Sequence, residues 1–374
     1  MKRLIPLVLA AGLALAACGS SSKSSTSTTT LAPSSNSGSP NLNIGNPASA
    51  VTLSEAGSSL LYPFLQQLVA PLQAKYSNIT LSPAAGGSGK GISDAIAGTV
   101  EMGGSDAYLS NSDIAANPGL VNIPIVISSQ AVNYNLPGIS NLKLSGNVLA
   151  EIYQGKITKW NDPAIVALNP GVTLPGSGIV PVRRVDGSGD TFIFTSFLSA
   201  TNTAWQSGPA FGTTVSWPSV SAELTASGNP GMVQTCHSTP GCIAYVGISA
   251  ENSALQAGLG QAELQNAAGN FVQSSATTVN SAVTAGATNI PADLAAPLID
   301  EPGAQSYPIV NFEYIVVKDT QSSAAVAQAI RTFLAFASDT SGGSAPSYLA
   351  KDQFEPLPAS VIPQVQAAIA KITG

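Results

Sequence analysis

Short apolar runs typical of strands alternate with segments of helical periodicity from residue 51 to the C-terminus. The strand-like run 50–54 is followed by residues 58–75, where apolar side chains recur at the helical spacing of three or four positions. We predict further strands at residues 78–83, 100–106, 178–185, 242–249 and 311–318, and further helices at residues 91–100, 110–117, 189–200, 322–337 and 360–372. This alternation predicts an α/β fold with largely parallel sheets. About 320 folded residues favour two lobes over one.

Composition narrows the classes of partner. Only 9% of the 374 residues are charged and the net charge is −6, whereas about 25% charged residues is usual in soluble proteins. The sequence has no basic run, so we expect no nucleic-acid partner. The acidic balance also means that any site for an anion must be built locally.

The N-terminus has the form of an export signal. Lys2 and Arg3 precede an apolar run at residues 4–17, which is too short to span a bilayer comfortably. The run ends in "LAACG", which resembles the bacterial lipoprotein box. We therefore predict a signal peptide at residues 1–17 and a fatty-acyl lipid such as palmitate on Cys18. The alternative is an ordinary signal peptide with an incidental cysteine.

The segment that follows the signal is rich in Ser, Thr, Asn, Gly and Pro and shows almost no apolar pattern. This composition is typical of a flexible tether, which we assign to residues 18–50. Together with the signal, it predicts a lipid-anchored protein on the extracytoplasmic face of the cell membrane.

Two cysteines lie in the stretch "CHSTPGC". In an exported protein, Cys236 and Cys242 are expected to form a disulfide. The alternative, a zinc site that includes His237, lacks an obvious fourth ligand, so we expect no metal. His237 is also the only histidine of the sequence and lies beside the expected disulfide, which argues against Ser-His-Asp catalysis.

Four Gly/Ser turns connect a strand to a helical segment: "EAGSSLL", "AAGGSGKGI", "GGSDAYLS" and "RRVDGSGDTF". The N-terminus of a helix exposes unpaired N–H groups and a partial positive charge, which favour an anion. Each turn alone is better explained by a purely structural role, but four turns, one beside two arginines, favour a shared anionic ligand. A nucleotide-binding loop is excluded for the second turn, because Ala84 replaces its first glycine and Gly91 replaces its magnesium-binding hydroxyl residue.

The order of the motifs resembles that of the phosphate-binding proteins of bacterial phosphate importers, the PstS family. The resemblance rests on "AGSSLLYP", "GGSGKGI", "GTVEMGGSDAYLS", "YQGKITKWNDPAI", "RRVDGSGDTFIFTSFL", "PGCIAYVGIS" and "YPIVNFEYIVV". It extends from residue 51 to the C-terminus. The lipoprotein box and Asp190 make the actinobacterial lipoprotein members the most similar group.

The resemblance implies a type II periplasmic-binding-protein fold, in which two α/β lobes close over a ligand. Lobe 1 would comprise residues 51–127 plus 312–374, and lobe 2 residues 128–311, with crossing strands near residues 126–133 and 309–317. It further implies a monomer without cofactor or enzymatic activity. Its partners would be inorganic phosphate and the permease subunits of an ATP-driven importer.

The resemblance also implies a set of phosphate-binding residues. Arg184 would make the charged contact, and Asp186 would pair with it and hold it in place. Hydroxyl or backbone N–H donors and one acceptor, Asp106, would complete the site. The full expected set is Ser58, Ser59, Leu60, Ser88, Asp106, Arg184, Ser188, Gly189 and Asp190.

Asp190 is the departure from the family pattern, since many relatives carry threonine there. A carboxylate can accept a hydrogen bond from a P–OH group but meets only lone pairs on sulfate, so we interpret Asp190 as a discriminating group. The alternative is a helix cap or first-turn residue. Two other functions stay open: a secreted phosphatase that uses Asp106 or Asp190 with a metal, and a surface lipoprotein without a transport role.

Overall fold

The computed structural model describes residues 40–288 and 290–374, so the predicted signal peptide, Cys18 and most of the predicted tether lie outside the described residues. The last part of the segment assigned to the tether contacts the folded body. Arg331 Nε donates to the carbonyl oxygen of Leu42 at 2.9 Å, and the Gly45 N–H donates to Thr332 Oγ1 at 3.0 Å. These hydrogen bonds attach residues 42–45 to the helix that carries Arg331 and Thr332.

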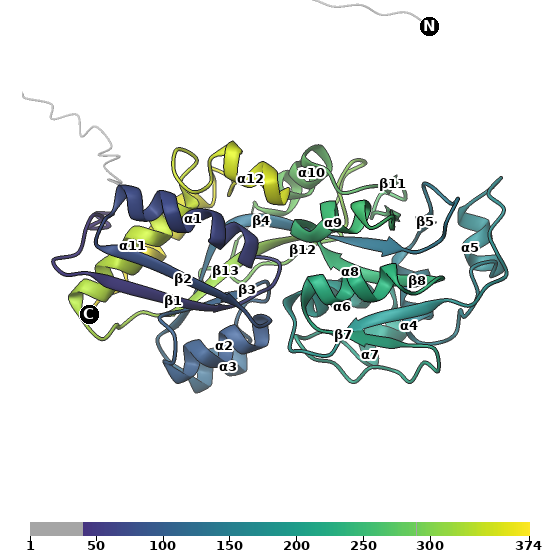
Figure 1. Ribbon diagram of the computed structural model, residues 1–374, viewed down its shortest axis with the longest axis horizontal. Helices are drawn as coiled ribbons and strands as arrows, with labels where there is room; N and C mark the ends of the chain where they lie inside the picture. Colours follow the sequence, from purple (N-terminus) through teal and green to yellow (C-terminus); the bar gives the residue numbers. More distant parts are fainter. Residues whose placement is uncertain (1–39, 289) are drawn as a thin grey trace, which may run out of the picture. The chain divides into compact units, whose positions relative to one another are not determined.

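The strands and helices follow the predicted alternation (Figure 1). The strands are β1 (Val51–Gly57), β2 (Ile79–Ala85), β3 (Met102–Ser105), β4 (Leu120–Tyr134), β5 (Lys143–Leu144), β6 (Val180–Arg184), β7 (Leu224–Ala226), β8 (Cys242–Gly247), β9 (Gly260–Gln261), β10 (Glu263–Gln265), β11 (Phe271–Val272), β12 (Leu298–Ile299) and β13 (Ile309–Lys318). The helices are α1 (Tyr62–Lys75), α2 (Ser88–Ala97), α3 (Asn111–Ala116), α4 (Gly146–Tyr153), α5 (Pro163–Leu168), α6 (Gly189–Thr201), α7 (Thr203–Ser207), α8 (Gly228–His237), α9 (Glu251–Gln256), α10 (Ala276–Gly286), α11 (Ala324–Ser338), α12 (Pro346–Asp352) and α13 (Ile362–Ala370).

The main sheet has the strand order β2-β1-β3-β13-β4-β8-β6-β7. Strands β1, β2 and β3, which we call the first half of the sheet, pair in parallel, and so do β6, β7 and β8, the second half. Between the halves the pairings of β3 with β13, β13 with β4, and β4 with β8 are antiparallel. The prediction of largely parallel sheets therefore holds for each half but not for the centre, where β4 and β13 run in opposite directions.

Strand β4 lies between the halves and pairs with a different strand at each end. Its residues 120–129 pair with β13, and its residues 130–134 pair with β8. The predicted crossing at residues 126–133 falls within this strand, and the one at residues 309–317 falls within β13. Both strands are buried along almost their whole length, which explains why they contain long apolar runs. The division into lobes at residues 127–128 and 311–312 remains a prediction.

Helix α1 shows how the apolar stripe becomes core. Phe64, Leu65, Leu68 and Leu72 are fully buried, each contributing about 1.5–3 kcal/mol relative to exposure. The helix begins at Tyr62 and not at residue 58, because the preceding turn is closed by Ser58. The N–H groups of both residues before the helix donate to Ser58 Oγ at 3.0 Å.

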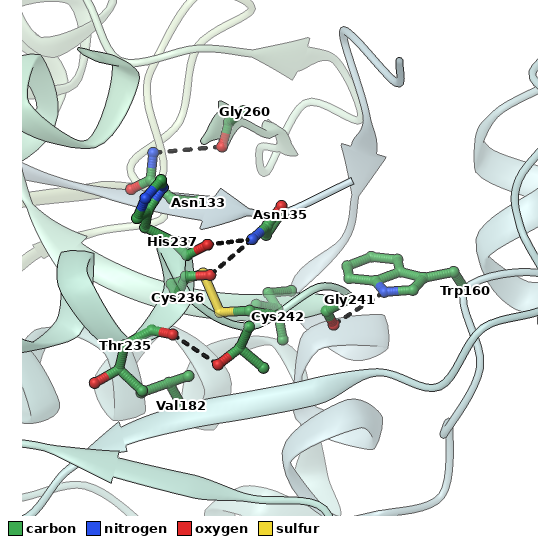
Figure 2. Close-up of a disulfide and its surroundings, with 12 residues drawn as sticks. Asn133, Asn135, Trp160, Val182, Thr235, Cys236, His237, Gly241, Cys242 and Gly260 are labelled. Carbon is green, nitrogen blue, oxygen red and sulfur yellow. Dashed lines mark hydrogen bonds between the residues drawn. A yellow bond between two sulfur atoms is a disulfide. The ribbon is translucent and has the colours of Figure 1, made fainter. Parts of the chain in front are cut away.

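The predicted disulfide between Cys236 and Cys242 is confirmed and joins the end of α8 to the start of β8 (Figure 2). The enclosed loop is fixed by further hydrogen bonds. Asn135 Nδ2 donates to the carbonyl oxygens of Cys236 and His237 at 2.9 and 2.8 Å, and Trp160 Nε1 donates to that of Gly241 at 3.1 Å. The His237 ring lies 2.7 Å from a backbone carbonyl oxygen, that of residue 257, through its Nδ1.

Candidate functional site

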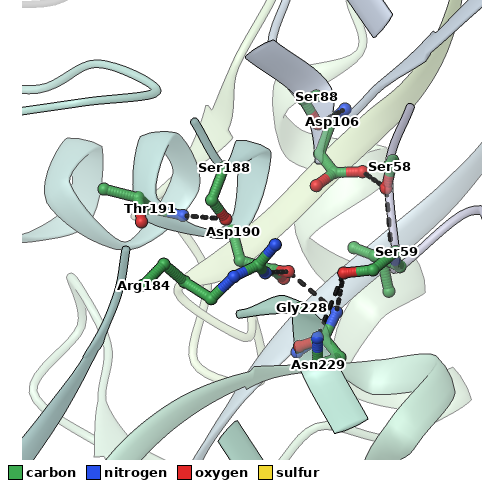
Figure 3. Close-up of polar contacts among 12 residues, drawn as sticks. Ser58, Ser59, Ser88, Asp106, Arg184, Ser188, Asp190, Thr191, Gly228 and Asn229 are labelled. Atoms are coloured by element: carbon green, nitrogen blue, oxygen red, sulfur yellow. Dashed lines mark hydrogen bonds and ion pairs between the residues drawn. The ribbon is translucent and has the colours of Figure 1, made fainter. Parts of the chain in front are cut away.

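The Gly/Ser turns of the two halves meet at one place (Figure 3). Ser59 follows β1 in the first half, and its Oγ accepts the backbone N–H of Asn229 in α8 at 3.1 Å. The Gly89 N–H donates to the carbonyl oxygen of Gly187 at 2.9 Å. A Cβ at Gly189 would collide with Ser88 Oγ and Asp106 Oδ2, so only glycine allows the start of α6 to come this close to these side chains. Groups far apart in sequence therefore surround one small buried region.

Arg184 is the buried cation of this region. It ends β6, and its side chain is only 1% exposed. Its Nε and Nη2 both donate to the Asp186 carboxylate, the first at 2.8 Å, and its Nη1 donates to Asp190 Oδ2 at 2.8 Å. The expected pairing with Asp186 is thus present. Burial would raise the pKa of Asp186, but the hydrogen bonds and charge of Arg184 outweigh it and lower that pKa.

Asp190 lies in the first turn of α6, but it is not the helix cap. Ser188 is the N-cap, and its Oγ accepts the Thr191 N–H at 3.2 Å. The Asp190 carboxylate instead accepts from Asn229 Nδ2 at 2.8 Å and from Gln130 Nε2 at 3.2 Å, besides Arg184. Burial raises its pKa to about 7, the charge of a neighbouring carboxylate adds to this, and Arg184 opposes it.

That neighbouring carboxylate is Asp106, which follows β3. Its Oδ1 accepts the hydroxyl proton of Ser58, and its backbone N–H donates to Ser88 Oγ at 3.1 Å. The side chain is almost completely buried, and burial raises its pKa although hydrogen bonds from Glu313 and Ser58 and the charge of Arg184 oppose this rise. Two carboxyl groups in one buried region suit a ligand that brings its own protons.

The serines of the site differ in what their hydroxyl groups do. Ser59 Oγ and Ser188 Oγ each accept a backbone N–H, which leaves the hydroxyl proton for donation to a bound oxyanion. Ser58 Oγ instead donates to Asp106 and accepts the Leu60 N–H at 3.0 Å. Ser58 and the Leu60 N–H, both expected as phosphate contacts, are therefore engaged with the protein itself.

No group of three or more His, Cys, Asp or Glu side chains within residues 40–288 and 290–374 is arranged to hold a metal ion. A cavity of about 500 Å³ borders the site, lined on one side by Gly89, Ala107 and Tyr108, and on the other by Phe192 and Thr213. These residues adjoin Ser88, Asp106 and the start of α6. The cavity itself is not lined by Asp106, Arg184 or Asp190, which are buried beside it.

Comparisons with known proteins identify the family. The PBP superfamily domain matches residues 24–340. The phosphate-binding protein PstS of Xylella fastidiosa strain 9a5c is 32% identical over 320 residues, which cover 85% of each chain. That of Haemophilus influenzae is 34% identical over 325 residues, which cover 86% of this chain and 93% of the relative. The chain belongs to the PstS family. PstS3 of Mycobacterium bovis strain BCG is 37% identical over 246 residues, 64% of this chain and 63% of that one.

Solved structures support the same fold for this PstS-family chain. The periplasmic phosphate-binding protein PfluDING, described with bound phosphate at pH 8.5, superposes with a TM-score of 0.67 at 22% identity, over 85% of this chain and 92% of that one. A phosphate-binding protein from Stenotrophomonas maltophilia gives a TM-score of 0.65 at 22% identity, over 85% and 93%. The expected family and the two-lobed α/β fold are confirmed.

Sequence reasoning missed several polar groups that this PstS-family site contains. Gln130 projects from β4, Asn229 from the start of α8, and Glu313 from β13. Signals for them existed: "SSQ" interrupts an apolar strand, "SGNPG" is a fifth Gly/Ser turn at a helix start, and "FEY" places an acid inside a buried strand. None of these signals indicates which partner the side chain meets.

Proposed function

We propose that this protein captures inorganic phosphate on the extracytoplasmic side of the membrane and delivers it to the permease subunits of an ATP-driven importer. The observation that carries the proposal is the buried Arg184, held by Asp186 among Gly/Ser turns from both halves of the sheet. The PstS proteins of Xylella fastidiosa and Haemophilus influenzae, named for phosphate binding, support it.

The site would bind phosphate with donors from both halves. Arg184 supplies the charge, and the hydroxyl groups of Ser59 and Ser188 donate to the phosphate oxygens. Ser88 and the N–H groups of Gly189 and Asp190 complete the donors in our proposal. Ser58, because it is engaged with Asp106, serves to orient that acceptor.

We further propose that Asp106 and Asp190 exclude sulfate. At neutral pH phosphate keeps at least one proton, which a carboxylate accepts as a hydrogen bond, whereas sulfate keeps none. An acceptor held against another acceptor in a buried site costs several kcal/mol, enough for roughly 10³-fold discrimination. Asp190 would fill this role while it also accepts from Arg184.

Calorimetric titration with phosphate and sulfate tests both statements. We expect saturable phosphate binding and sulfate binding that is weaker by roughly 10³-fold. Similar affinity for the two anions would refute the discrimination, and no phosphate binding would refute the function. Release of phosphate from a chromogenic phosphoester would instead support the alternative of a phosphatase. We propose that the protein is no enzyme and expect no release.

The proposed anchor has its own test, because it rests on residues outside those described. No helix among residues 40–288 and 290–374 is long and apolar enough to cross a membrane. We expect Cys18→Ala to release the exported protein from membranes without a change in phosphate affinity, measured by membrane fractionation and calorimetry. Retention of the exported variant in the membrane fraction would contradict lipid attachment at Cys18.

A further inference from the structure

Glu313 lies directly behind the acceptor Asp106. It projects from β13, is completely buried, and its Oε1 accepts the hydroxyl proton of Ser128 in β4. Asn311, also in β13, connects the same two groups: its Nδ2 donates to the carbonyl oxygen of Asp106 at 2.6 Å and lies 3.4 Å from Glu313 Oε1. The two strands that cross between the halves therefore hold Glu313 in place.

The second carboxyl oxygen of Glu313 lacks a donor within the described part of the chain, and the carboxyl lies beside another acid. No donor group among the described residues reaches Glu313 Oε2. The carboxyls of Glu313 and Asp106 are neighbours: each shifts the pKa of the other, and Asn311 Nδ2 contacts both residues. Two ionised carboxylates are both acceptors and repel each other, so this contact is favourable only when one of them carries a proton.

The surrounding charges decide which of the two carries it. Asp106 and Asp190 both face Glu313 with negative charge, and Tyr314 follows it in β13. Arg184 acts on Asp106 and is already paired with Asp186 and Asp190. Asp106 accepts in addition from Ser58, which favours its ionised form. The arrangement thus stabilises the charge on Asp106 and not on Glu313.

We propose that Glu313 is held protonated and donates a hydrogen bond to Asp106, so that it positions Asp106 as the ionised acceptor for a phosphate P–OH group. This inference rests on the proposed function. Burial, the charge of Asp106 and their hydrogen bond raise the pKa of Glu313 well above its usual range, while the same hydrogen bond opposes the rise that burial causes in the pKa of Asp106. Glu313 is a positioning residue, because it acts on the ligand only through Asp106.

Two substitutions of Glu313 separate its charge from its hydrogen bond. Glu313→Leu removes the donor to Asp106 and leaves the Ser128 hydroxyl without its acceptor, so we expect phosphate affinity at pH 7 to fall at least about tenfold. Glu313→Gln keeps both hydrogen bonds, since its amide N–H donates to Asp106 and its amide oxygen accepts from Ser128. We expect it to recover most of the loss, to within about threefold of the unmodified protein. Calorimetry with inorganic phosphate measures both.

A matched control is Glu251→Gln. Glu251 is also buried, and burial raises its pKa to about 7, but its carboxylate accepts from Asn133 at 3.0 and 3.1 Å, outside the proposed phosphate contacts. We expect its phosphate affinity to be unchanged. If Glu313→Gln loses as much affinity as Glu313→Leu while both remain folded by circular dichroism, Glu313 is needed in its ionised form and the inference is wrong.

Infrared spectroscopy detects the proton directly. With ¹³C-labelled glutamate, which separates the signal from that of Asp190, a protonated glutamate C=O band that responds to added phosphate should be present at pH 7 in the unmodified protein and in Glu251→Gln. This phosphate-sensitive glutamate band should be lost in Glu313→Gln, while a band from the buried Glu55, whose pKa is raised to about 8, remains. If Glu313→Gln does not fold, ¹³C-glutamate labelling of Glu251→Gln identifies the band instead. Phosphate binding without any phosphate-sensitive glutamate band would overturn this inference alone. Absence of phosphate binding in the unmodified protein would overturn the proposed function.

Discussion

The two halves of the site contain different kinds of group. The first half supplies hydroxyl groups and one acceptor, through Ser59, Ser88 and Asp106, while its nearby Lys90 pairs with Asp94 at the surface. The second half supplies Arg184, the α6 N-terminus and Asp190. The positive charge of Arg184 is neutralised by its ion pairs with Asp186 and Asp190. Neither half alone forms a complete anion site.

This difference indicates what holds the ligand and what selects it. Arg184 is committed to two carboxylates, so the region is not strongly positive even though it binds an anion in our proposal. In our proposal, attraction depends on one guanidinium and on backbone dipoles, while selection depends on Asp106 and Asp190, one from each half. Substitution of Arg184 should therefore change mainly affinity, whereas substitution of an acceptor should change selectivity or its dependence on pH.

The largest effect is expected for Arg184→Ala. It removes the cation and leaves the buried Asp190 beside the bound anion, so phosphate binding should weaken by about 2–4 kcal/mol. Calorimetry measures this. Arg183→Ala is the matched control, because Arg183 pairs with Glu223 at 2.8 Å and is partly exposed. Near-native affinity in Arg184→Ala would remove this residue from the site.

A smaller change, in selectivity, is expected for Asp106→Asn. The amide can donate a hydrogen bond to an unprotonated oxygen, so the barrier to sulfate should fall by about 1–3 kcal/mol. The measurement is the ratio of phosphate to sulfate affinity, with Asp113→Asn as a control in an exposed part of the same half. An unchanged ratio would show that the first half does not select the anion and would leave selection to Asp190.

Local features of the site were predictable because they depend on neighbouring residues. The Gly/Ser turns mark helix starts in any fold. Arg184 and Asp186 lie two positions apart at the end of one strand, so their pairing is a local contact. The start of α1 was placed four residues early, because residues 58–61 form a turn capped by Ser58 Oγ before the regular helix begins. Helix α12 was missed because seven residues with a leading proline give little periodicity.

Contacts across the sheet could not be predicted in the same way. Gln130 and Glu313 meet Asp190 and Asp106 only because β13 and β4 lie between the two halves, an order that hydrophobic periodicity does not contain. Asn229 reaches Ser59 and Asp190 from a turn that looks like any other Gly/Ser turn in the sequence. These residues control the charges of the acceptors, which is what the sequence left open.

The effect of pH is the smallest when taken over one pH unit, and it depends on one acceptor in each half. Burial and the charge of Asp106 raise the pKa of Asp190 to about 7. Below that pH, Asp190 holds a proton that it can donate to a phosphate oxygen; above it, both carboxylates need a P–OH group, which phosphate itself loses as pH rises. The complex therefore retains a proton that the separate partners release. By linkage, phosphate affinity should fall as pH rises above neutrality, by up to about tenfold per unit for one proton.

Asp190→Thr should flatten this dependence, because a threonine hydroxyl donates as well as accepts and does not titrate in this range. The same substitution should leave sulfate largely excluded, since Asp106 still opposes an unprotonated anion from the first half. The comparison is phosphate affinity from about pH 6 to pH 9 in both proteins, with sulfate affinity at pH 7. In the unliganded protein, the stability of the folded state should change with pH in the same direction as the affinity. The proton on Asp190 favours the folded state because folding raises the pKa of this group, and this stabilisation is lost as pH rises through about 7. Parallel affinity profiles in the two proteins would contradict the two-acceptor site and leave Asp190 as a partner of Arg184 alone.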